Sequence, residues 1–155
     1  MKNVLLTVMV ATAIFGGYTA QAAQGTAKAK MKVVTALAVS QVSDLLFSDA
    51  AAGAPEEVVA ADSSETAQNA SFKITGEPSR PLTVTLPADG TVTMITGSGS
   101  PDESISVNSF TSNFVTGLDT SGQADLFVGA TRAQLSGTQA SGDYEADFVV
   151  DVAYQ

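Results

Sequence analysis

Two pairs of adjacent carboxylates are the residues in this chain whose spacing comes closest to acid–base chemistry. The pairs are Glu56-Glu57 and Asp102-Glu103. Both stand in loop-like sequence, and neighbouring side chains in an extended segment point to opposite sides. General acid–base catalysis needs a shielded pair with separated pKa values. We therefore interpret both pairs as solvated loop charge.

Most other residue types that perform catalysis or bind metals are missing. The 155 residues include no Cys and no His, which excludes a disulfide framework, a thiol nucleophile, a Ser-His-Asp triad and imidazole ligands for zinc. No serine-nucleophile motif occurs either. We expect no enzymatic activity and no cofactor. Calcium binding stays open, because the segments 100–103 and 119–125 are rich in oxygen ligands.

The net charge of the chain limits the classes of molecule that it can bind. Sixteen acidic residues stand against 7 basic ones, a formal net charge of -9. A chain of this charge is repelled by nucleic acid and by anionic lipid. We expect no nucleic-acid partner.

The first residues have the three-part composition of a secretory signal peptide. A positive start at Lys2 precedes an uncharged apolar run over 4–15 and the small-x-small sequence Ala20-Gln21-Ala22. The apolar run is too short for a permanent membrane helix. We predict that residues 1–22 are a signal peptide. The remaining chain, without a membrane span, would reach the periplasm, the cell surface or the extracellular medium.

Alternation of apolar and polar residues dominates the rest of the chain and predicts strands. The segment 48–69 is acidic and rich in small residues, and we expect it to be a loop. Other expectations are a strand over 34–42 covered on both faces, a hairpin joining 82–86 to 91–94, and a long last strand over 144–154. Seven or eight short strands predict an all-β fold, an immunoglobulin-like antiparallel β-sandwich over residues 34–155.

The two ends of the expected mature chain complement each other. Within the segment 23–33, apolar side chains alternate with lysines from Ala27 to Val33, and the last strand has one apolar face beside acidic side chains. We predict that these strands pair, within one molecule or between molecules, because opposite charges on adjacent strands favour pairing. The donor residues would be Ala27, Ala29, Met31 and Val33 with Lys28, Lys30 and Lys32. The acceptor residues would be Tyr144, Phe148, Val150, Val152 and Tyr154 with Glu145, Asp147 and Asp151.

Several short motifs carry a resemblance. The C-terminal pattern from Gly142 to Tyr154 resembles the closing strand of spore coat protein U-like and archaic chaperone–usher pilin domains. The blocks 37–47 and 128–130 resemble other strands of those domains. The hairpin sequence over 84–87 and the Tyr154-Gln155 end resemble a family of secreted bacterial proteins known only as a domain of unknown function.

The resemblance implies an incomplete immunoglobulin-like fold. In such pilins, a periplasmic chaperone covers the gap beside the last strand before the N-terminal extension of the next subunit replaces it. We expect an exported structural or adhesive subunit of fimbrial type that assembles by β-strand complementation, with self-association or a chaperone and usher as partners. The alternative is a monomeric periplasmic or secreted binding module with a self-complete sandwich.

Overall fold

The computed structural model describes residues 24–113 and 116–155, so the expected signal peptide lies outside the described residues. The chain divides into two units, Met1–Lys32 and Val33–Gln155. In the first unit, residues 24–32 are extended, exposed and without strand assignment. All strands assigned within 24–113 and 116–155 lie in the second unit, and so does the core.

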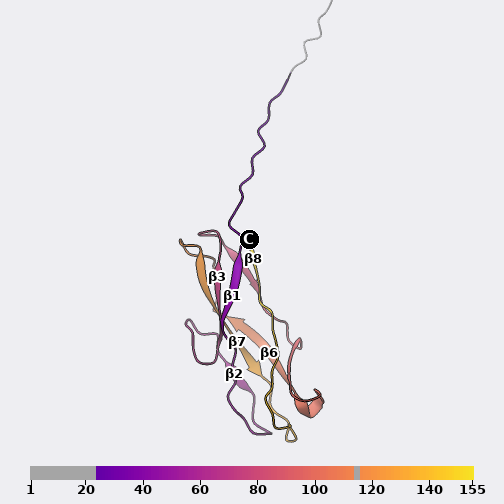
Figure 1. Cartoon of the computed structure of the whole chain (residues 1–155). Helices are drawn as coiled ribbons and strands as arrows, with labels where there is room; N and C mark the ends of the chain where they lie inside the picture. Colours follow the sequence, from indigo (N-terminus) through magenta and orange to yellow (C-terminus); the bar gives the residue numbers. More distant parts are fainter. Residues whose placement is uncertain (1–23, 114–115) are drawn as a thin grey trace, which may run out of the picture. The chain divides into compact units, whose positions relative to one another are not determined.

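The second unit is an all-β antiparallel sandwich, as the sequence predicts (Figure 1). One sheet has the order β1-β3-β7-β6-β5, with β2 also paired to β7, and the other sheet is β4-β8. A single 3-10 turn, η1 (Pro101–Glu103), precedes β6. The strands are β1 (Ala38–Ser43), β2 (Glu57–Val59), β3 (Ala70–Thr75), β4 (Leu82–Thr85), β5 (Val92–Ile95), β6 (Ser104–Ser112), β7 (Gln123–Arg132) and β8 (Asp151–Tyr154).

The core lies between the sheets and is centred on β3 and β7. Ile74, Leu126 and Val128 are fully buried, and Leu82 of the small sheet packs against them. A second cluster contains Val92 of β5. The alternation of the sequence produces this core, because every second side chain of a strand points to the same face of its sheet.

β1 differs from its prediction. The sequence favours a strand covered on both faces, but β1 is an edge strand that pairs only with β3 among the described strands. Its residues Ala38 to Val42 are all exposed, with Val39 at 40% and Val42 at 59%. The apolar side chains on both faces of β1 are therefore exposed, although their pattern predicts that other elements pack against both faces.

The predicted hairpin over 82–94 is wrong. The turn exists, with the Thr91 N–H donating to the Ala88 carbonyl oxygen at 3.2 Å. However, β4 pairs with β8 and β5 pairs with β6, so the turn connects the two sheets. The physical reason is that inward residues of opposite sheets face the same core. Alternation alone therefore does not distinguish a hairpin from a crossover.

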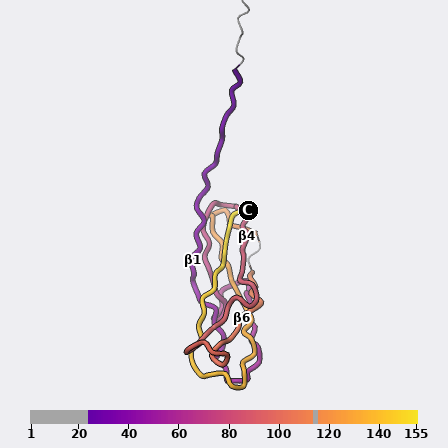
Figure 2. The backbone as a smooth tube through the Cα atoms, turned by 90° about the vertical axis from the view of Figure 1, so that its right-hand side faces the viewer, coloured from indigo at the N-terminus to yellow at the C-terminus, as the bar shows by residue number. Residues whose placement is uncertain are grey.

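The last strand is much shorter than predicted. Only Asp151–Tyr154 forms a strand, paired with β4, and Glu145 forms an isolated bridge to Ile95 of the large sheet. Between these points, residues 146–150 run along the domain without strand pairing (Figure 2). The segment passes from one sheet to the other, so no single neighbour offers a continuous ladder.

The acidic loop 48–69 is largely irregular, as expected, and contains the short strand β2. It is anchored by Asn69, which is fully buried. The Asn69 amide donates to the carbonyl oxygens of Ala61 and Ser64, each at 2.9 Å, and its Oδ1 accepts from the Thr66 N–H at 2.8 Å. One buried amide therefore closes the loop on itself.

Within 24–113 and 116–155, no helix is long and apolar enough to cross a membrane.

Candidate assembly groove

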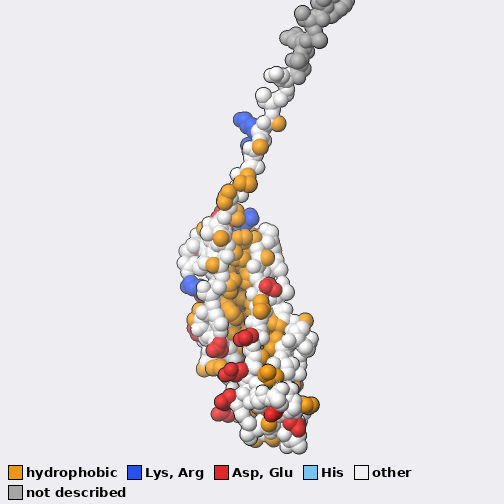
Figure 3. Space-filling view, turned by 45° about the vertical axis from the view of Figure 1, so that its right-hand side comes forward, with side chains coloured by type: hydrophobic (Ala, Val, Ile, Leu, Met, Phe, Trp, Pro, Cys, Tyr) orange, Lys and Arg blue, Asp and Glu red, His pale blue; other side chains and the backbone are white. Residues whose placement is uncertain are grey.

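An open cavity of about 680 Å³ lies between the chain after β1 and the segment before β8. We call this cavity the edge groove. Figure 3 shows a band of apolar side chains along one face of the domain, with carboxylates beside its lower part. The lining residues are Asp44, Leu45, Leu46, Met94, Ile95, Tyr144, Glu145, Ala146, Asp147 and Phe148.

The two walls of the edge groove are held by different neighbours. On one side, the Leu46 N–H donates to the Gln68 carbonyl oxygen at 2.8 Å. On the other side, Glu145 and Ile95 exchange backbone hydrogen bonds of 3.0 and 3.2 Å. In the described part of the chain, no backbone hydrogen bond joins 44–47 to 144–150. The facing backbone edges are therefore unpaired across the groove.

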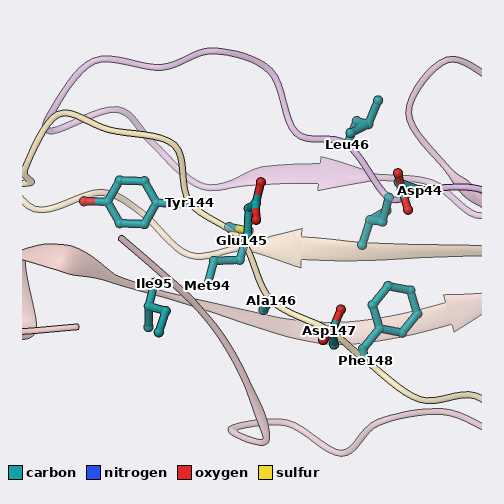
Figure 4. Close-up of a pocket in the computed structure, with 10 residues that line it drawn as sticks. Asp44, Leu46, Met94, Ile95, Tyr144, Glu145, Ala146, Asp147 and Phe148 are labelled. Atoms are coloured by element: carbon teal, nitrogen blue, oxygen red, sulfur yellow. The ribbon is translucent and has the colours of Figure 1, made fainter. Parts of the chain in front are cut away.

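The floor of the edge groove is apolar and aromatic. Phe148 points from the terminal segment toward the cavity (Figure 4). Its ring lies 6.3 Å from Phe72 in an edge-to-face arrangement and 5.2 Å from Phe110. A smaller space of about 30 Å³ extends beneath it, lined in part by Met94 and Leu45. The floor can accept a flexible apolar side chain.

The rim of the edge groove is acidic on both sides. Asp44 stands on the wall after β1, and Glu145 and Asp147 stand on the terminal segment (Figure 4). All three are exposed, and no Lys or Arg lines the cavity. The groove therefore combines an apolar floor with a negative rim.

Part of the predicted acceptor face lines this groove, namely Tyr144, Glu145, Asp147 and Phe148. The even-numbered acceptor residues Phe148, Val150, Val152 and Tyr154 are half-buried against the core, and Tyr144 lines the cavity. Glu145, Asp147 and Asp151 are exposed. The sequence reasoning missed the opposite wall, Asp44 and Leu46, and the two β5 residues Met94 and Ile95. The sequence signal for this wall was the acidic Asp44 close to the apolar Leu46. The sequence alone does not show that this wall faces the terminal segment, because that arrangement depends on the tertiary fold.

The predicted donor segment forms no strand in the single chain. Residues 24–37 carry no strand assignment, and β8 pairs with β4. Met31 is 87% exposed and Val33 is 79% exposed. Ala27, Ala29 and the lysines 28, 30 and 32 are exposed as well. Pairing within one molecule, one of the two arrangements predicted, is therefore not formed here.

Tyr154 fixes the point at which the donor segment joins the domain. Its hydroxyl donates to the Thr35 carbonyl oxygen at 2.9 Å and accepts from the Glu77 N–H at 2.6 Å. The Arg80 guanidinium stacks on its ring at 5.5 Å. A side chain at position 76 would collide with the hydroxyl, so Gly76 leaves room for it. The chain thus enters the domain beside β8.

Two acidic side chains outside the groove organise loops. Glu103 accepts hydrogen bonds from the Ser98 hydroxyl at 2.6 Å and from the N–H groups of Ser98 and Ser100. The Ser98 hydroxyl and then Ser100 lower the pKa of Glu103 to about 2. Burial raises the pKa of Glu57, but hydrogen bonds from Ser48 and the charge of Arg132 lower it overall.

The segments proposed for calcium use their oxygens locally. The Asp119 carboxylate accepts from the N–H groups of Ser121 and Gln123, each at 2.8 Å. The Asp102 carboxylate accepts from the hydroxyls of Ser136 and Thr138. Among the described residues, no group of three or more acidic side chains could hold a metal ion.

The fold and the groove define an antiparallel β-sandwich with an open groove beside its edge strand β1. The sequence profile of the Domain of unknown function (DUF4402) family matches residues 50–154, more than half of the chain. The chain belongs to this family, which confirms the expected membership of a family of unknown function. The match includes the terminal wall of the edge groove. Comparison with curated proteins and with solved structures found no match.

Proposed function

We propose that this protein is an exported structural or adhesive surface subunit that assembles by β-strand complementation. The extended segment 23–33 of one copy fills the edge groove of the next. The observation that carries the proposal is the edge groove itself, with its apolar floor and with no backbone hydrogen bond between its two walls among the described residues. An exposed edge is a ready template for another strand.

Exposed apolar surface along the groove supports the proposal. Leu46 and Ile95, which line the groove from opposite sides, are 53% and 51% exposed. Large apolar side chains exposed beside a groove are typical of an interaction site in a folded domain. A strand inserted between 44–46 and 146–150 would cover the groove and offer hydrogen-bond partners to the backbone of 146–150, which lies outside the strand ladders.

The segment before Val33 has the composition and length of a missing strand. Ten residues, 24–33, are exposed and extended, and at about 3.3 Å per residue they span roughly 33 Å. The terminal wall, residues 144–154, is of similar length. Alternating small or apolar residues and lysines suit a strand with one face on a core and one in water.

The resemblance of the C-terminal pattern to pilin domains also supports assembly by strand complementation. Export through the signal peptide over 1–22 belongs to this proposal, and so do a periplasmic or surface location and a transient chaperone. The lack of Cys means that a subunit of this kind would be held together without disulfides.

Deletion of residues 23–33 tests the proposal. The chain 23–155 should form ladders on gels of unheated samples, whereas the deleted chain should be a folded monomer. A synthetic peptide of residues 23–34 should bind the deleted chain and raise its Tm. Ladders that persist after the deletion, or a peptide that does not bind, would contradict strand complementation by this segment.

A further inference from the structure

We propose that the edge groove selects the lysine segment of a second copy by charge, with Met31 seated in the 680 Å³ cavity. This inference rests on the proposed function and adds the register and the recognition rule. These contacts between the donor segment and the groove explain why the chain would bind a second copy of itself rather than another exposed strand.

Charge is divided unevenly between the two units. Residues 33–155 hold 3 basic and all 16 acidic residues, a net charge of 3 − 16 = −13, whereas residues 24–32 hold three lysines and no acid. Opposite potentials of this size steer association and discourage like-charged partners. The segment of one copy is therefore attracted to the domain of another.

Met31 is the donor side chain that suits the cavity. It is the longest of the four apolar donor residues, and its unbranched thioether adapts to irregular spaces. The cavity floor is formed by Phe148, Met94 and Leu45. Ala29 and Ala27 would then lie beyond the cavity, beside Val150 and Val152, which pack against the core. Small side chains need no cavity of their own at those positions.

The same register places the lysines on the acidic rim. When Met31 points inward, Lys30 and Lys32 point outward, because side chains alternate along a strand. Carboxylates flank that position from both walls, Asp44 on one side and Glu145 with Asp147 on the other. Paired charges across adjacent strands then favour this register over a slip by one residue, which would bury lysines.

The register also determines how copies are arranged. Met31 sits near 144–148, and the donor's own domain begins two residues later, at Val33. Thr35, close to the start of the acceptor's domain, is hydrogen-bonded to Tyr154 at the other end of the terminal segment. Each domain is then joined at opposite ends, which gives an open head-to-tail chain.

Complementary charge reversal tests the inference. One variant carries Lys28→Glu, Lys30→Glu and Lys32→Glu; the other carries Asp44→Lys, Glu145→Lys and Asp147→Lys. Each alone should assemble at least about tenfold more slowly than the unmodified chain, in line with the loss of electrostatic steering. An equimolar mixture should recover ladders, because each segment then meets a groove of opposite charge.

The matched control is a triple reversal away from the groove, Asp62→Lys, Glu65→Lys and Asp125→Lys, which should assemble normally. Circular dichroism checks that every variant is folded. If each of the two triple variants assembles normally on its own, selection by charge is contradicted. Failure of the folded mixture to assemble would overturn it too.

The outcomes separate this inference from the proposed function. If the charge variants assemble normally but deletion of 23–33 abolishes ladders, strand complementation stands and charge selection fails. If the deleted chain still forms ladders, the proposed function fails. If the unmodified chain stays monomeric and does not bind the 23–34 peptide, both proposals fail.

Discussion

The Tyr154 hydroxyl donates a hydrogen bond of 2.9 Å to the carbonyl oxygen of Thr35, 119 residues earlier in the chain. The same hydroxyl accepts from the Glu77 N–H at 2.6 Å. One side chain of β8 therefore ties the start of the domain to the loop after β3. The extended segment before Val33 leaves from this fixed point.

Tyr154→Phe should destabilise the domain without preventing assembly, because the lost hydroxyl lies away from the cavity. Two hydrogen-bonding groups lose their partner, which should lower the free energy of unfolding by about 1–3 kcal/mol. Urea unfolding measures the change, and Ser141→Ala at an exposed position is the control. Equal stability of the two variants would show that this contact does not anchor the domain.

Asn69→Ala should destabilise the domain through the 48–69 loop. The buried amide satisfies two carbonyl oxygens and one N–H group, and each group left unsatisfied costs roughly 1–3 kcal/mol. Limited proteolysis should then cut this loop faster. Gln68→Ala, at the exposed neighbouring position, should have a smaller effect on both measurements. Similar effects at the two positions would contradict the anchoring role of Asn69.

Gly129→Ala tests the close contact between β2 and β7. A Cβ at position 129 would collide with backbone atoms of Val59 and Ala60, which cannot move aside as a flexible side chain can. The expected loss of stability is about 1–3 kcal/mol, seen as a lower Tm. Gly137→Ala is the matched control, because nothing lies within 4 Å of its Cβ. A neutral Gly129→Ala variant would contradict this packing.

Glu103→Gln should change how stability depends on pH. The folded state lowers the pKa of Glu103 from 4.5 to about 2. The ionised carboxylate therefore stabilises the fold above about pH 4.5, and that contribution is lost as the pH falls toward 2. The variant should be less stable than the unmodified chain at pH 7 and nearly equal to it at pH 2.

Thermal unfolding over this pH range makes the comparison, and Asp62→Asn, at an exposed loop position, is the control. A constant difference between Glu103→Gln and the unmodified chain across the range would show that the Ser98 and Ser100 hydrogen bonds do not depend on the charge.

The sequence predicts the strand content and the inward faces well, because alternation reports which side chains share a face. It predicts sheet membership poorly. The alternation of 82–94 is equally compatible with one sheet or two, and the structure places β4 and β5 in different sheets. The long alternation of apolar and polar residues over 144–154 correctly indicates that one face of this segment is half-buried. It does not report that backbone pairing is confined to Glu145 and the four residues of β8.

The candidate site could be predicted only in part. The acceptor residues Phe148 and Val150 follow from periodicity, because both lie on one face of the terminal segment. Asp44 and Met94, on the other sides of the groove, are separated from that segment by at least 50 residues and meet it only through the tertiary fold. The apolar residues of β1 do carry a signal, since two apolar faces on an edge strand indicate a missing neighbour.

Crosslinking between two copies is the most direct test of the central claim. The chain contains no cysteine, so Met31→Cys in one variant and Ala146→Cys in another introduce single reactive sites, and Thr120→Cys is a control at an exposed turn. A short bismaleimide should join Met31→Cys to Ala146→Cys in a mixture of the two variants, and not to Thr120→Cys. Equal crosslinking to positions 146 and 120, or no crosslinking to position 146, would contradict insertion of the segment into the edge groove.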